Sequence, residues 1–159
     1  MLASEILHQS GFDIKPNDVK SGLKNVVKLT GLRGRWETIF KKPLAIADIA
    51  HNEAGINEVI RHVKTIPHKK LHVVFGTVND KDTGKILSLL PKKATYYFCK
   101  ADIPRALDQY ILSGMAGKYG LNGKTFGTVR QALSTAKARA SSKDLILITG
   151  SAFVVAEVI

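Results

Sequence analysis

Apolar residues recur with two different spacings along this chain, and the two spacings alternate. Short apolar runs of strand length stand between longer segments in which apolar residues return every three or four positions, as on one helix face. The runs predict about six strands, at residues 36–40, 44–47, 71–76, 94–99, near 125–126, and 145–150. The helical spacing predicts helices at 53–65, 82–90, 104–120 and 128–140, with another beginning in the last apolar segment, F-V-V-A-E-V-I.

Strands that alternate with helices in this way predict βαβ units. The expected fold is α/β, a Rossmann-like and mostly parallel sheet of about six strands with helices on both faces. Residues 1–31 differ, because they show only two short helices, one closed by Gly11 and one opened by Pro16. These helices are too small to form a core, so we expect a helical segment over 1–31 and the main domain over 32–159.

Composition narrows the function classes only partly. The 24 Lys and Arg against 13 Asp and Glu give a net charge of +11, which favours acidic partners such as nucleotides. Lys69–Lys70 and Lys92–Lys93 fall in turns, and no basic stripe with interleaved aromatic residues appears, so a solvated basic surface is favoured over nucleic-acid binding. Cys99 is the single cysteine, which suits a reducing, cytoplasmic setting, and no apolar run predicts a membrane span.

Three polar side chains crowd one predicted strand-to-helix turn, in the sequence Asp48-Ile-Ala-His51-Asn52. Ligands of open α/β sheets lie beyond the carboxyl ends of the strands, so Asp48 is a candidate for ribose hydroxyls and His51 for substrate contact or proton transfer. The alternative is that Asp48 and Asn52 only cap the helix and His51 is a solvated turn residue. Glu53 in the first helical turn disfavours a phosphate at this helix end.

Further candidates lie in other turns. Arg35 precedes a strand, where its guanidinium could hold a phosphate, although its spacing alone favours an exposed arginine in a basic loop. Lys81 follows the strand at 71–76 and is a candidate phosphate contact, the alternative being a helix-initiating loop. Ser151, in a small-residue turn, either meets a ligand or caps the last helix. No phosphate-binding loop and no metal-ligand spacing of histidines is found.

These pieces together resemble the carboxy-terminal domain of folylpolyglutamate synthase/dihydrofolate synthase, a member of the Mur ligase superfamily. The resemblance rests on six motifs in register over about residues 30–159: Gly34-Arg35, Asp48-Ile-Ala-His51-Asn52, Phe75-Gly76 with Asp80-Lys81-Asp82, Pro104-Arg105-Ala106, Gly150-Ser151, and Val155-Ala156-Glu157-Val158. Residues 1–31 look like the helical end of that family's central ATPase domain.

The resemblance implies an ATP-dependent amide ligase, in which a folate or dihydropteroate carboxylate becomes an acyl phosphate that the amine of L-glutamate attacks. It implies that Arg35 and Asp48 contact ATP and that His51 and Ser151 lie near glutamate. We further expect Asn52 and Lys81 to bind the nucleotide and His51 to be the catalytic residue. Mg²⁺ is expected to be held by the central domain, so this chain is expected to be a fragment that is inactive alone.

One departure from the family pattern concerns the central turn. The usual Asp-Gly-Ala-His-Asn-Pro reads Asp48-Ile-Ala-His51-Asn52-Glu53 here, without the flexible glycine and the rigid proline. Three alternatives to the folate ligase remain open from sequence: the corresponding domain of a peptidoglycan-precursor Mur ligase, a basic nucleic-acid-binding α/β module, and a nucleotide-binding regulatory domain without chemistry.

Overall fold

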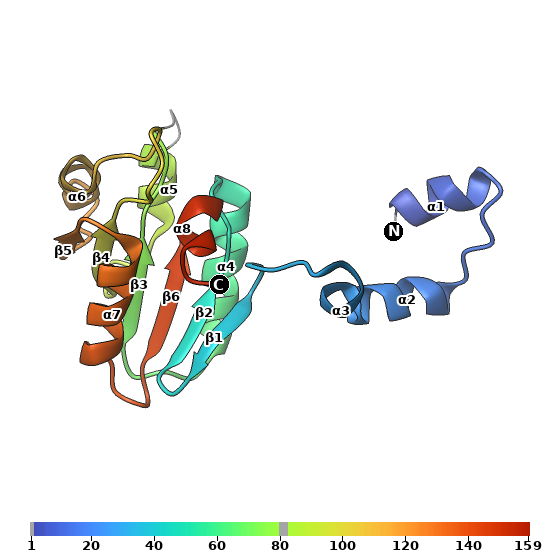
Figure 1. Ribbon diagram of the computed structural model, residues 1–159, viewed down its shortest axis with the longest axis horizontal. Helices are drawn as coiled ribbons and strands as arrows, with labels where there is room; N and C mark the ends of the chain where they lie inside the picture. Colours follow the sequence, from blue (N-terminus) through green and yellow to red (C-terminus); the bar gives the residue numbers. More distant parts are fainter. Residues whose placement is uncertain (1, 80–82) are drawn as a thin grey trace. The chain divides into compact units, whose positions relative to one another are not determined.

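The computed structural model describes residues 2–79 and 83–159, and the chain divides into two compact units, Met1–Arg33 and Gly34–Ile159 (Figure 1). The first unit contains α1 (Leu2–Gln9), α2 (Pro16–Lys24) and α3 (Val26–Thr30). The continuous apolar spacing after Pro16 predicted one helix there, which is wrong. Asn25 divides it, because its φ of −105° and ψ of 10° lie outside the helical range; its side-chain amide also donates to the carbonyl of Ser21 at 2.9 Å.

The second unit is built on one six-stranded sheet, which confirms the α/β prediction. Its strands are β1 (Glu37–Lys41), β2 (Leu44–Ala47), β3 (Leu71–Phe75), β4 (Thr95–Cys99), β5 (Gly123–Phe126) and β6 (Leu145–Thr149). They lie in the order β1-β2-β6-β3-β4-β5, with β1 antiparallel to β2 and all the other pairs parallel. Consequently β2, β6 and β3 are neighbours whose carboxyl ends meet at one edge of the sheet.

Helices cover both faces of this sheet (Figure 1). One apolar cluster contains side chains of α4 (Glu53–Thr65), α5 (Thr83–Leu89) and α6 (Gln109–Gly117). The other contains side chains of α7 (Val129–Arg139) and α8 (Ala152–Ala156). Because β3 and β6 are buried along their whole length, neither alternates apolar and polar residues: β6 begins with four apolar residues, and β3 is apolar except for the buried His72.

The start of α6 differs from the prediction that Pro104 opens the helix. The helix begins at Gln109, because the Asp108 side chain accepts the N–H groups of Tyr110 and Ile111 at 2.8 and 3.2 Å. The segment before it is tied across to the loop after β3: Leu107 donates its N–H to the Thr77 carbonyl at 2.9 Å. This cross-link determines where Arg105 lies.

Among the helices in the described residues, none combines the length and the apolar character that crossing a membrane requires.

Candidate functional site

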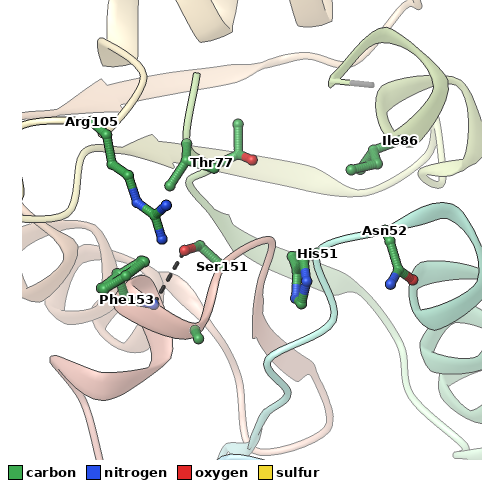
Figure 2. Close-up of a pocket in the computed structure, with 9 residues that line it drawn as sticks. His51, Asn52, Thr77, Ile86, Arg105, Ser151 and Phe153 are labelled. Carbon is green, nitrogen blue, oxygen red and sulfur yellow. Dashed lines mark hydrogen bonds between the residues drawn. The ribbon is translucent and has the colours of Figure 1, made fainter. Parts of the chain in front are cut away.

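A cavity of about 350 Å³ lies where β2, β6 and β3 end (Figure 2). Each of these strands contributes a turn to it, so residues from distant parts of the sequence meet there. Its lining residues are His51, Asn52, Thr77, Val78, Ile86, Arg105, Ser151, Ala152 and Phe153. The cavity therefore lies at the edge where ligands of open α/β sheets are expected.

The turn between β2 and α4 supplies His51 and Asn52. Asn52 caps α4, since its side-chain oxygen accepts the N–H of Gly55 at 2.8 Å. The Nδ1 atom of His51 lies 3.0 Å from the carbonyl oxygen of Ile49. Because a carbonyl only accepts, Nδ1 carries the hydrogen in that bond, and Nε2 of the neutral ring has a lone pair available to accept a proton.

The turn after β6 supplies Ser151, which is buried and caps α8 by accepting the N–H of Phe153 at 3.1 Å. Gly150 before it has a φ of 104° and donates its N–H to the carbonyl of Ala50 at 3.1 Å. A Cβ atom at position 150 would lie 2.5 Å from the carbonyl oxygen of Gly76. Only glycine fits there, so this turn is held between the loops that follow β2 and β3.

Arg105 is a site residue that the sequence analysis named only within a motif. The N–H of Asn79 donates to its carbonyl at 3.0 Å, which fixes the backbone of this segment beside the loop after β3. Its guanidinium carbon lies 4.7 Å from the centre of the Phe153 ring, and Figure 2 shows it extended toward Ser151. The signal in the sequence was its position just after β4, at the same carboxyl edge.

Arg35 and Asp48 do not line the cavity. Asp48 instead contacts the loop that carries Arg35. The half-buried Asp48 carboxylate accepts the N–H of Trp36 at 2.8 Å and that of Ala50 at 2.9 Å. Arg35, the residue before Trp36, is exposed. Lys81 lies outside the described residues. The structure thus brings His51, Asn52 and Ser151 onto one cavity and places Asp48 against the Arg35 loop; the binding roles of all five stay predictions.

Comparison with known proteins identifies the family. The family model for the Mur ligase glutamate ligase domain matches residues 34–152. The chain belongs to this family. This Mur ligase domain is 36% identical over 159 residues to a "Probable bifunctional folylpolyglutamate synthase/dihydropteroate synthase" of Haloferax volcanii, matching 98% of the chain and 18% of that protein.

Two solved structures resemble this Mur ligase domain over nearly its whole length. E. coli FolC in complex with DHPP and ADP is 29% identical with a TM-score of 0.82, covering 96% of this chain and 35% of that one. A bifunctional folylpolyglutamate synthase/dihydrofolate synthase with Mn, AMPPNP and L-glutamate bound is 25% identical with a TM-score of 0.82, covering 98% and 37%. The chain thus spans between 18% and 37% of the length of these three proteins.

The lining of the cavity in the Mur ligase domain suits an anion. Arg105 supplies a permanent positive charge and Ser151 a hydroxyl, and no Asp or Glu is among the described residues that line the cavity. A metal ion fits less well, since the described residues contain no cluster of three or more His, Cys, Asp or Glu. We therefore assign no Mg²⁺ ligand among residues 2–79 and 83–159.

Proposed function

We propose that this chain is the glutamate-binding domain of an ATP-dependent folylpolyglutamate synthase/dihydrofolate synthase. In this proposal the complete ligase joins L-glutamate to the carboxylate of a folate or of dihydropteroate. The observation that carries the proposal is the meeting of His51, Arg105 and Ser151 around one cavity, with no Asp or Glu among the described residues that line it. The names of the relatives support the substrate class.

The chemistry of the three side chains fits an amino acid. The Arg105 guanidinium is a bidentate partner for a carboxylate. The Ser151 oxygen already accepts the N–H of Phe153, so its own hydroxyl hydrogen remains to donate to the same ligand. Nε2 of His51 would accept the proton that the glutamate amine releases as it attacks the acyl phosphate; the amide bond forms while the bond to the phosphate oxygen breaks, and inorganic phosphate leaves. Binding and proton removal would then be combined in one cavity.

ATP binding is proposed for the neighbouring side of the same edge. ATP supplies the phosphoryl group that activates the folate or dihydropteroate carboxylate. Arg35 has the charge and the exposure to hold a phosphate, and each Asp48 oxygen keeps a lone pair beyond its backbone hydrogen bond for a ribose hydroxyl. The side-chain nitrogen of Asn52 is a remaining donor, because its oxygen is used in capping. Lys81 is proposed only from its place in the sequence.

A central ATPase domain is the proposed partner of this domain. Residues 1–31 are proposed to be its helical end, and this part of the chain exposes large apolar side chains suited to packing against another domain: Ile6, Leu7, Phe12, Leu23, Val27 and Leu29. The chain matches only 18% and 35% of the length of two of these relatives, so the unmatched part of each is long enough to contain such a domain. A cytoplasmic location goes with this proposal, since the reaction consumes ATP and Cys99 is a free, buried thiol.

A domain replacement tests the proposal. The part of the E. coli enzyme that corresponds to this chain is replaced by residues 1–159, and ADP release is measured with L-glutamate, L-alanine or diaminopimelate as the amino acid. We expect ADP release that depends on L-glutamate and is lost in His51→Ala. Preference for alanine or diaminopimelate would favour the peptidoglycan ligase instead. A folded chimera that responds to none of them would reject the ligase proposal.

A further inference from the structure

The edge of the sheet opposite the candidate site is strongly basic. We define the amino edge as residues 41–43, 66–70, 91–94, 118–122 and 140–144, the segments that precede β2, β3, β4, β5 and β6. These five segments, all described in the structure, contain eight lysines and one acidic residue, Asp144. This edge therefore carries a large excess of positive charge.

Asp144 is bonded within the domain. The residue is 5% exposed, and its carboxylate accepts the N–H of Ser141 at 2.7 Å and that of Lys70 at 3.1 Å. It also lies 3.6 Å from Nε2 of the buried His72. Its oxygens thus contact backbone N–H groups and the buried His72 ring. The side chains of Lys69 and Lys93 are exposed at the surface.

A cavity of about 260 Å³ opens among these lysines. Its floor is apolar, with Ile60, Val63, Leu71, Pro91 and Ala94, and its rim carries Lys64, His68, Lys69, Lys70 and Lys93. The rim is anchored from beneath, because Lys69 donates its N–H to the Lys143 carbonyl at 2.8 Å and Leu145 donates to the Lys70 carbonyl at 2.9 Å. Four lysine side chains thus surround one hollow, and the backbone of two of them, Lys69 and Lys70, is fixed by hydrogen bonds to neighbouring segments.

Favourable interaction with helix dipoles explains only one of the four lysines around this cavity. Lys64 lies in the last turn of α4, where a cation is favourable. Lys69, Lys70 and Lys93 lie outside helices, so the helix dipole gives no reason for them. Like charges around one hollow repel each other, and an anion in the hollow relieves that repulsion.

We propose that this amino-edge cavity binds a small polyanion, a molecule with two or more carboxylate or phosphate groups on a short body. The concave shape and the apolar floor suit a small molecule. A nucleic-acid surface typically uses arginines and exposed Phe, Tyr or Trp rings, and none of these is among the described residues that line this cavity. This site is separate from the candidate active site, so the proposal does not depend on the proposed ligase function.

The test titrates the isotope-labelled full chain, at low ionic strength, with tri-γ-glutamate, with tripolyphosphate and with a short single-stranded oligonucleotide, and follows backbone amide shifts. We expect one or both small polyanions to shift the amides of residues 64–71 and 93–94 saturably, with affinity falling as salt is added. Which of the two binds more tightly tells whether carboxylate or phosphate is the natural group. Neutral triglutamine is expected to shift none of these amides.

A pair of charge-matched variants decides whether the cavity is the site. Lys69→Gln/Lys93→Gln is expected to weaken binding about tenfold, as the loss of two close charge contacts requires. Lys41→Gln/Lys42→Gln removes the same charge from the same edge outside the cavity and is expected to weaken binding less than about threefold. Equal losses in the two variants, no saturable binding of either small polyanion, or oligonucleotide binding tighter than theirs would overturn the proposal.

Discussion

The carboxylate of Asp48 holds the backbone of Trp36 in a left-handed conformation. The Trp36 N–H donates to Oδ2 of Asp48 at 2.8 Å, and Trp36 has a φ of 51°, rare for a residue with a large side chain. Oδ1 of the same carboxylate accepts the N–H of Ala50 at 2.9 Å. One side chain therefore links the loop that carries Arg35 to the turn that carries His51.

Removing this link should destabilise the domain. Asp48→Ala leaves two backbone N–H groups without their charged acceptor and is expected to lower the free energy of unfolding by about 2 kcal/mol. Asp48→Asn keeps one acceptor and turns an N–H toward the other donor, so a similar loss is expected. Urea unfolding of the two variants measures this, with the exposed Asp102→Asn as control. Losses no larger than that of the control would show that the link is not needed.

Gly150 should tolerate no side chain. Gly150→Ala forces alanine to a φ of 104° and places Cβ 2.5 Å from the Gly76 carbonyl oxygen. We expect a loss of stability of about 3 kcal/mol or more. Gly114→Ala is the matched control: it lies within α6 with open space around its Cβ position, and is expected to stabilise by about 0.5–1 kcal/mol. Equal melting temperatures for the two variants would contradict this account of the turn.

Arg105 should act on amino-acid binding in the proposed ligase. In the domain-replacement enzyme, Arg105→Ala is expected to raise KM for L-glutamate about tenfold or more and to change kcat little, because it removes a bidentate charged contact. Arg105→Lys should recover only a part of the affinity, since an ammonium lacks the planar fork. Steady-state kinetics with Arg130→Ala as control measures this. An effect on kcat alone would assign Arg105 a different role.

Stability should depend on pH through the buried His72. Burial lowers the pKa of His72, and its contact with Asp144 offsets this only in part. Below its ordinary pKa near 6.5, the unfolded chain therefore binds a proton that the folded chain does not, and stability falls as the pH drops. One such proton accounts for a slope of at most about 1.4 kcal/mol per pH unit.

The pH window separates His72 from its partner. Burial raises the pKa of Asp144, but hydrogen bonds from Ser141 and the contact with His72 outweigh this effect and lower the pKa overall. The Asp144 carboxyl therefore titrates at a more acidic pH than His72. Unfolding measured from pH 7 to 5 should show the fall, and His72→Gln should flatten it. His8→Gln, at an exposed position, serves as control. If the free energy of unfolding fell with pH as steeply in His72→Gln as in the unchanged chain, other groups would be responsible for the pH dependence.

The periodicity of the sequence predicts the elements well where packing on the sheet decides them. The helix expected at 53–65 is found as Glu53–Thr65, because Ile56, Val59, Ile60 and Val63 all face the core. The start of α6 depends on hydrogen bonds, and the break at Asn25 on a local backbone conformation, that spacing does not reveal. The segment before α6 is also held by the hydrogen bond from Leu107 to Thr77, which lies 30 positions earlier in the chain.

The candidate site could be predicted only in part, for a topological reason. Parallel strands end at one edge, so His51 and Ser151 were expected there, but their direct adjacency follows from β6 lying between β2 and β3. The strand order is set by packing across the whole domain and has no local signature. Arg105 depends on the same order, which is why its place in the cavity emerges only from the structure.

The most direct measurement is the mass of the product that the domain-replacement enzyme makes from a folate and ¹⁵N-labelled L-glutamate. We expect a folate heavier by one labelled glutamyl residue, formed with ATP and not formed by His51→Ala. A folded enzyme that hydrolyses ATP while the mass of the folate stays unchanged would contradict the claim that this chain supplies the glutamate side of a ligase.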